Sequence, residues 1–169
     1  MTRNDADEFA EFVRATGPRL HRAALLLTGD HHLTEDLTQA TYARVYASWR
    51  RVSRADDPIA YARRTLLNTY LSHRRLRRNS ELPTDPTIGE ARAAPEADQA
   101  SRMDLLDALA SLPPHDRAVL VLRYWEDRSV DDTAHDLGLT QTAVRTRARR
   151  ALRRLRPLIG TDHTERTSP

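Results

Sequence analysis

Seven arginines and no acid lie between Gly138 and Arg156, in a chain whose formal net charge is only +3. A guanidinium group binds a phosphate, or the major-groove edge of guanine, through two parallel hydrogen bonds. Like charges four residues apart on a helix repel one another, as Arg145 and Arg149 would, and no acid within this segment offsets them. We therefore expect a polyanionic partner, nucleic acid in the first place, with the chain's own acidic segment and simple solvation as the alternatives.

The small net charge conceals a second basic block. Residues 41–78 contain ten arginines and two acids, whereas residues 79–116 contain two arginines and eight acids. Residues 79–98 combine three prolines and a glycine with few large apolar side chains, a composition that buries too little surface to fold alone. The charge map therefore favours two domains with a basic face each, joined by an acidic linker.

The predicted boundaries follow from these changes in composition. We predict a first domain over residues 5–78 and a flexible acidic linker over residues 79–100. A second domain is predicted over residues 101–157, and the polar residues 158–169 are expected to be a disordered tail.

The sequence gives little support for an enzyme. It contains no cysteine, which excludes disulfides, a thiolate nucleophile and cysteine-ligated zinc. No Walker loop, dinucleotide fingerprint or nucleophile elbow occurs. His31, His32, Glu35 and Asp36 lie close together, but a loop and helix start explain them better than a metal site. We therefore expect no catalytic residue, no metal and no cofactor.

The start of the chain is acidic and polar, and no apolar run approaches the roughly 18 residues of a membrane span. We expect a cytoplasmic protein that does not contact a membrane.

Helical spacing of apolar residues predicts an all-α fold, since no segment alternates apolar and polar residues as a strand would. In the first domain, a stripe of apolar residues at helical spacing begins before Gly17-Pro18 and continues after it. Thr34 is expected to cap a second helix, and Asp57 a third one whose first turn contains Pro58. In the second domain, Tyr124 is expected on the apolar side of a helix.

The second domain ends in the pattern of a helix-turn-helix. Ser129 followed by Asp132 resembles a capping box that starts a short helix, and Gly138 can adopt the left-handed conformation that ends it. Thr140 is expected to cap a longer helix on which apolar and arginine side chains occupy different faces.

In such a motif the N-terminal turn of the second helix enters the major groove. Base edges or flanking phosphates are within reach of Thr140, Gln141, Thr142, Arg145 and Arg149. Among these, arginine suits guanine and glutamine suits adenine. Later arginines are expected to follow phosphates and to add affinity without sequence information: Arg150, Arg153 and Arg154.

Segments of the first and second predicted domains together resemble a known protein family. Residues 34–49 and 56–78 read TEDLTQATYARVYASW and DDPIAYARRTLLNTYLSHRRLRR, and they resemble region 2 of the sigma-70 superfamily. Residues 105–156 are similar to region 4, and too few residues lie between for region 3. This arrangement resembles the extracytoplasmic function (ECF) sigma factors, and the motifs are most similar to those of the actinobacterial SigE family.

The resemblance implies an RNA polymerase sigma factor, which binds core polymerase and directs promoter recognition and transcription initiation. A stand-alone helix-turn-helix transcriptional regulator is the alternative, because its DNA-binding domain would look nearly the same. An adaptor that binds RNA through its arginines is a third possibility. An anti-sigma factor is a further candidate partner of the chain.

The resemblance also implies three sets of site residues. The core-polymerase set, expected against the β′ clamp helices, is Asp36, Leu37 and Gln39. The −10 set, expected on the opened promoter strand, is Arg54, Asp56, Asp57, Arg63, Arg64, Asn68, Arg74, Arg75, Arg77 and Arg78. The −35 set, expected on double-stranded DNA, is Thr140, Gln141, Thr142, Arg145, Arg147, Arg149, Arg150 and Arg153. Region 4 is also expected to meet the β flap.

Aromatic residues of the first domain leave two interpretations open. Tyr61, Tyr70 and Trp49 are candidate stacking platforms for an opened base, although their helical spacing is more typical of core positions.

Overall fold

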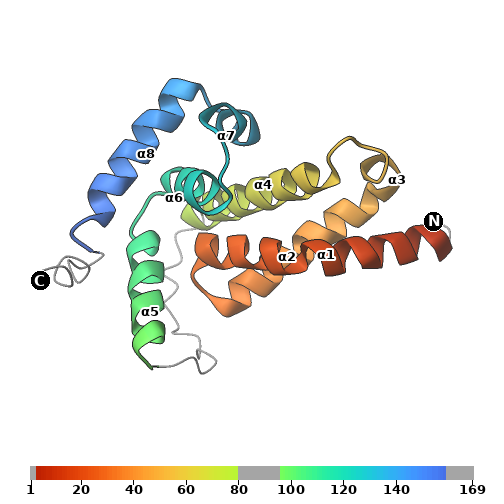
Figure 1. Cartoon of the computed structure of the whole chain (residues 1–169), viewed down its shortest axis with the longest axis horizontal. Helices are drawn as coiled ribbons and strands as arrows, with labels where there is room; N and C mark the ends of the chain where they lie inside the picture. Colours follow the sequence, from red (N-terminus) through yellow and green to blue (C-terminus); the bar gives the residue numbers. More distant parts are fainter. Residues whose placement is uncertain (1–2, 80–95, 159–169) are drawn as a thin grey trace, which may run out of the picture. The chain divides into compact units, whose positions relative to one another are not determined.

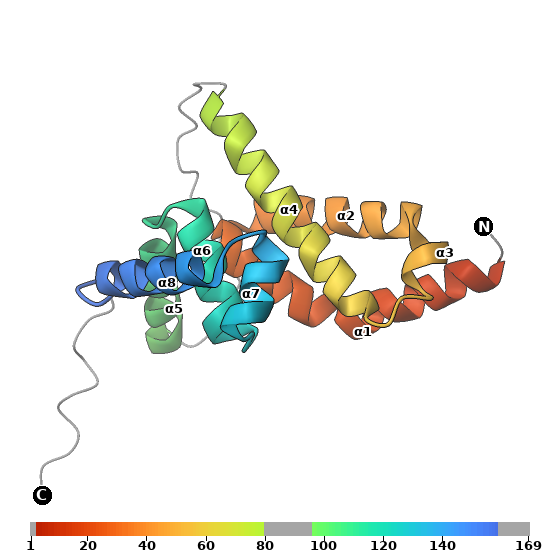
Figure 2. The ribbon, with the colours of Figure 1, turned by 90° about the horizontal axis from the view of Figure 1, so that it is seen from above.

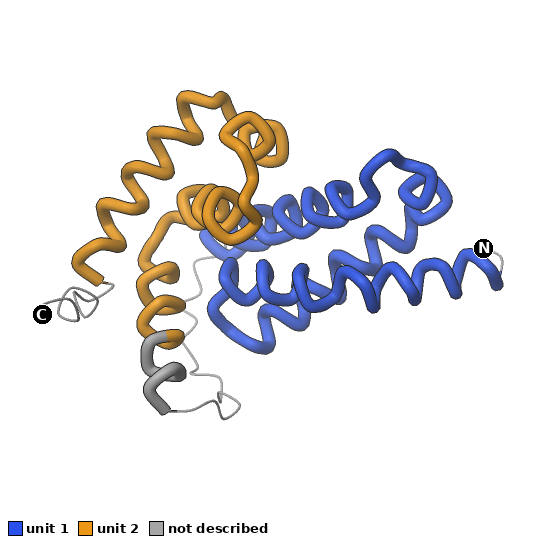
Figure 3. Tube along the Cα trace, in the orientation of Figure 1, with its two compact units in different colours: residues 1–89 blue, residues 90–169 orange. Residues whose placement is uncertain are grey.

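The computed structural model describes residues 3–79 and 96–158, the first six residues of the second range by backbone alone. Within these ranges every regular element is a helix, and the chain divides into two compact units, residues 1–89 and 90–169 (Figures 1 and 3). The predicted all-α fold with two small domains is confirmed. Most of the predicted linker and nearly all of the predicted tail lie outside the described residues.

The described part of the first unit consists of four helices: α1 (Arg3–Thr28), α2 (His31–Ala47), α3 (Trp49–Val52) and α4 (Pro58–Asn79). The helices α1 and α2 form a hairpin, and α4 crosses both of them (Figure 2). The core between them is aliphatic and consists chiefly of Leu20, Leu27, Leu37, Val45, Leu66 and Leu67.

An aromatic cluster extends this core towards α3. The ring of Trp49 lies 5.1 Å from the rings of Phe9 and Phe12, and Phe9 lies 4.8 Å from Tyr46. Trp49 and Tyr70 are buried, so of the two interpretations given above these two side chains fit the core position.

Two helix starts in the first unit differ in how well they were predicted. The Asp57 cap is confirmed, because its Oδ1 accepts the Ala60 amide at 2.9 Å. The Thr34 cap is wrong: α2 begins at His31, and Asp30, four residues before Thr34, caps it by accepting the Leu33 amide at 2.8 Å. Gly29 ends α1 with φ +71°, which leaves Asp30 extended and ready to cap, while Thr34 donates back to the Asp30 carbonyl at 2.7 Å.

The second unit contains α5 (Glu96–Ala110), α6 (Pro114–Leu120), the π-helical turn η1 (Val121–Trp125), α7 (Val130–Leu137) and α8 (Gln141–Leu155). Its core joins α6, α7 and α8 through Val119, Ala134 and Val144. Tyr124 is exposed, contrary to expectation. A π-helical turn takes more residues than an α-helical turn, so the apolar stripe read at α-helical spacing no longer predicts which side chain points inward.

Candidate nucleic-acid interface

The helix-turn-helix is built by local capping chemistry, as predicted. Ser129 Oγ accepts the Asp132 amide at 3.0 Å and starts α7, and Gly138 ends it with φ +63°. Thr140 Oγ1 then accepts the Ala143 amide at 3.1 Å and starts α8. The fully buried Val144 anchors the N-terminal half of α8 in the core. The turn therefore fixes the direction in which α8 presents its polar residues.

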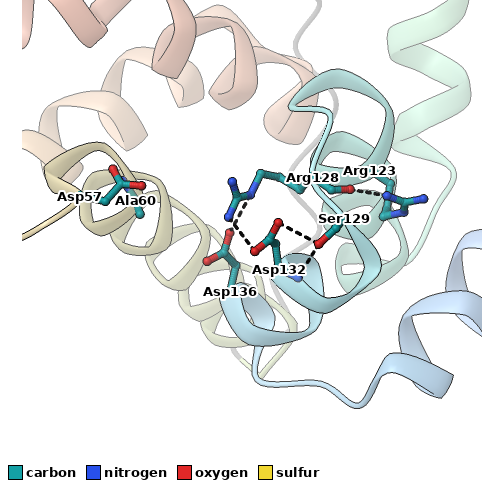
Figure 4. A network of polar contacts seen from close by, with 7 residues as sticks. All are labelled: Asp57, Ala60, Arg123, Arg128, Ser129, Asp132 and Asp136. Atoms are coloured by element: carbon teal, nitrogen blue, oxygen red, sulfur yellow. Dashed lines mark hydrogen bonds and ion pairs between the residues drawn. The ribbon is translucent and has the colours of Figure 1, made fainter.

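A polar network holds the segment before α7 (Figure 4). The Arg128 guanidinium lies 3.4 Å from Asp132 and 3.7 Å from the buried Asp136, and Arg123 donates to the Arg128 carbonyl. These contacts tie the loop to both ends of α7. Sequence reasoning did not single out Arg123, Arg128 or Asp136, because spacing alone does not show which charges pair.

At the N-terminal end of α8, three polar side chains form a chain of hydrogen bonds. Gln141 Nε2 donates to Asp131 Oδ1 at 2.8 Å, and Arg145 Nη2 donates to Gln141 Oε1 at 3.3 Å. The nitrogen and the oxygen of the Gln141 side-chain amide therefore each make one hydrogen bond within the protein. Arg145 keeps its other donors for a ligand, and Gln141 keeps a second N–H donor and a second oxygen lone pair.

Two arginines of the −35 set pair with a buried acid on another helix. Asp116 of α6 is 0% exposed, and its Oδ1 accepts from Arg147 Nη1 at 2.9 Å and from Arg150 Nη2 at 2.7 Å. Its Oδ2 accepts from Arg150 Nε at 2.8 Å. Sequence reasoning missed this acid, since Asp116 stands 31 and 34 residues from its partners and no pattern within α8 indicates it.

Burial and ion pairing shift the pKa of Asp116 in opposite directions. Burial raises the pKa of its carboxyl, but the hydrogen bonds and positive charges of Arg150 and Arg147 together outweigh burial and hold the pKa below its usual value. The same contact raises the pKa of Arg150 further. The Asp116 carboxylate is therefore ionised at neutral pH.

The remaining arginines of α8 face solvent. Arg149, Arg153 and Arg154 are exposed and form no ion pair within residues 3–79 and 96–158. Together with Arg145 they form the exposed cationic surface of α8. An uncompensated surface of this kind suits a polyanion.

The −10 set lies on α4 and on the loop before it. Arg54, Asp56 and Asp57 are exposed in that loop, and the exposed members on α4 are Asn68, Arg74, Arg75, Arg77 and Arg78. Arg64 is half-buried, and Arg63 is buried. Most of the set therefore lies at the surface of one helix and its entry loop, while Arg63 is packed inside the unit.

Tyr61 lies beside this loop and remains partly exposed. The Arg51 guanidinium lies 5.7 Å from the centre of the Tyr61 ring, and its Nη2 is 3.2 Å from the phenol oxygen. A hydrogen bond with Ser48, opposed by partial burial and assisted by Arg51, lowers the pKa of Tyr61. Unlike Trp49 and Tyr70, Tyr61 is not buried.

The core-polymerase set divides between the interior and the surface. Leu37 is buried in the core of the first unit, whereas Asp36 and Gln39 are exposed on α2. Arg44 of the same helix donates to Thr69 Oγ1 of α4 at 2.7 Å and ties the two helices together. Leu37 therefore anchors α2, and the two polar residues form the part that a partner can reach.

The described residues contain no group of three or more His, Asp or Glu side chains suited to a metal ion. None of their helices is both long enough and apolar enough to cross a bilayer.

Comparison with known proteins agrees with the division into two units. Residues 12–80 match the family described as Sigma-70 region 2, and residues 102–155 match Sigma-70, region 4. The RNA polymerase sigma-E factor of Streptomyces antibioticus is 36% identical over 162 residues, which cover 95% of this chain and 89% of that protein. The sigma-E factor of Streptomyces coelicolor is 36% identical over 149 residues, covering 88% and 84%.

Among solved structures, the sigma factor RpoE of Bartonella quintana, in complex with the anti-sigma factor NepR, has a similar fold. Its TM-score is 0.72 at 23% identity, covering 92% of this chain and 98% of that one. The matched regions, the relatives and the fold lead to one conclusion: this chain belongs to the sigma-70 family, as an RNA polymerase sigma factor of the extracytoplasmic function group.

Proposed function

We propose a division of labour among the surfaces of this sigma factor, which binds core RNA polymerase and directs promoter recognition and transcription initiation. The observation that carries the proposal is the division of α8 into two kinds of face. One face is buried through Val144, Ala151 and Leu155, and the others expose arginines. A helix fixed in this way can enter a groove of DNA without rearranging the domain.

The second domain, residues 101–157, would bind the −35 element. Arg145 would contact base edges near the N-terminal end of α8, and Thr140, Gln141, Thr142 and Arg149 would contribute there. Arg153 would bind phosphates further along the helix. Region 4 would also meet the β flap.

The first domain, residues 5–78, would bind the −10 element. The loop with Arg54, Asp56 and Asp57 would receive an unpaired base beside the partly exposed Tyr61. The exposed arginines of α4 would stabilise the opened strand and thereby offset the cost of unstacking. Residues 79–100 would tether the two domains, so that binding of one element raises the effective concentration of the other domain at its own element.

Asp36 and Gln39, positioned by Leu37, would contact the β′ clamp helices of core polymerase. In this role the chain would act in the cytoplasm and perform no bond chemistry of its own, since the polymerase forms the phosphodiester bonds. The sigma factor RpoE mentioned above is held by an anti-sigma factor. We propose that this chain too is controlled by an anti-sigma factor.

Run-off transcription with core polymerase on genomic DNA fragments tests the proposal. Discrete transcripts are expected when both proteins are present and none when either is omitted. A stand-alone regulator would not bind core polymerase, so failure of the chain to co-purify with the enzyme, together with an absence of transcripts, would contradict the proposal. The match to region 2 disfavours that alternative.

Replacing Arg145 by Ala should relax the base preference at specific positions of the −35 element, whereas Arg153→Ala should weaken binding evenly on all sequences. Loss of a bidentate contact to a base costs about 1–3 kcal/mol of discrimination, and loss of a phosphate contact lowers the salt slope of log K by about 0.9. Holoenzyme affinity for a series of single base-pair variants, measured at several salt concentrations, separates the two effects. Equal effects of both substitutions on every sequence would contradict the assignment of Arg145 to base edges and Arg153 to phosphates.

A further inference from the structure

The ion pairs between Asp116 and α8 leave part of each guanidinium group unused. Arg150 engages the carboxylate edge-on through Nε and Nη2, so its Nη1 donors are left over. Arg147 uses only Nη1. The side chains of Arg147 and Arg150 are 31% and 48% exposed, whereas the Asp116 side chain has no exposed surface. Each arginine therefore spans from a buried anion to the surface of the protein.

We propose that Asp116 is a positioning residue for promoter binding. It fixes the guanidinium groups of Arg147 and Arg150 so that their remaining donors face the phosphates of the −35 element. The proposal rests on the proposed role of α8 in DNA binding. Asp116 itself contacts no DNA, because it is buried beneath the two arginines.

The contacts act on the helix as well as on the two side chains. At helical spacing, Arg147 and Arg150 flank the buried stripe of Val144 and Ala151 on the side away from Arg145. The bond to α6 therefore resists rotation of α8 about its own axis. A fixed rotation sets the direction in which Arg145 points.

Positioning also reduces the entropy lost on binding. An exposed arginine has many rotamers, and most of that freedom is lost when its guanidinium binds a phosphate. Arg147 and Arg150 are already immobilised by a carboxylate that stays ionised. They therefore bind phosphate with a smaller loss of freedom than Arg153 or Arg154, which form no ion pair with any residue that the structure describes.

Net charge alone predicts the opposite effect for the loss of this acid. Asp116→Asn removes a negative charge from beneath a DNA-binding helix, and charge neutralisation would strengthen binding and steepen its salt dependence. Positioning predicts weaker and less selective binding. The sign of the change in affinity therefore distinguishes the two explanations.

The test uses holoenzyme of the full chain and the genomic fragment that gives the strongest run-off transcript. Asp116→Asn should lower affinity about tenfold and reduce the preference for that fragment over one with a scrambled −35 element. Asp104→Asn makes the same change in charge on an exposed acid of α5 and should leave both quantities unchanged. Affinity of Asp116→Asn equal to or above wild type would overturn the proposal. Absence of binding by wild-type holoenzyme would instead refute the proposed function.

Two further variants separate positioning from a general loss of structure. Once Arg147→Gln and Arg150→Gln have removed both guanidinium groups, adding Asp116→Asn should change affinity no further, and an additional loss would contradict the proposal. Asp116→Glu keeps the charge but moves the carboxylate by one methylene. If Asp116→Asn loses helical circular dichroism, this variant decides: reduced selectivity with wild-type helicity supports positioning, and wild-type selectivity overturns it.

Discussion

Asp36→Arg combined with Gln39→Ala should reduce run-off transcription and binding to core polymerase by roughly a hundredfold or more. Both side chains are exposed on α2 three residues apart, and the burial of Leu37 directs them outward. At an interface that accepts an acid, a new cation faces like charge, which costs several kcal/mol. Since each 1.4 kcal/mol corresponds to a factor of ten, about 3 kcal/mol accounts for the expected loss.

Titration of labelled variant against core polymerase measures this effect directly. Glu11→Arg, at an exposed position of α1, makes the same charge reversal in the same unit and should bind as wild type does. The double variant should also keep the affinity of the free protein for DNA, because neither residue belongs to the −10 or −35 set. Undiminished transcription by the double variant would show that these residues of α2 do not contact the polymerase. It would also favour the alternative function, a stand-alone regulator.

The parts of the fold that sequence predicted well are those governed by local chemistry. Ser129, Gly138 and Thr140 were assigned as helix boundaries, and each does what was expected of it. A capping side chain bonds an amide only a few residues away, and a left-handed glycine ends a helix whatever surrounds it. The helix-turn-helix could therefore be located to the residue before any tertiary contact was known.

Where two local solutions competed, sequence could not choose between them. Asp30 and Thr34 are both good caps, and the turn at Gly29 decided in favour of Asp30. Tyr124 was misplaced for a different reason: the chain leaves α-helical geometry at η1, and the spacing argument assumes that geometry throughout.

Contacts between distant segments were beyond sequence reasoning. Family motifs named Leu37 and Arg63 as members of binding sets, yet both side chains are buried, because a motif records residue type and not the direction in which a side chain points. The repulsion expected among the arginines of α8 is partly relieved by Asp116, an acid on another helix. Only the folded chain brings these groups together.

Leu66→Ala should lower the free energy of unfolding of the first unit by about 2–5 kcal/mol, because the truncated side chain leaves a cavity that the surrounding helices fill only in part. Leu66 is 1% exposed at the crossing of α4 with the α1–α2 hairpin, whereas Leu76 is 61% exposed on the same helix. Leu76→Ala is the matched control and should change stability by no more than about 0.5 kcal/mol. For a domain of this size, the midpoints of thermal unfolding of the two variants should differ by roughly 10–30 °C.

The two tryptophans of the chain allow the first unit to be followed separately. Trp49 packs on Phe9 and Phe12 within this unit, and Trp125 belongs to the other, so a Trp125→Phe background leaves Trp49 fluorescence as a report on the first unit alone. In that background Leu66→Ala should shift the Trp49 transition and Leu76→Ala should not. Equal transitions for the two variants would mean that α4 does not hold the hairpin together. The −10 and core-polymerase sets would then lack the common core on which their proposed arrangement depends.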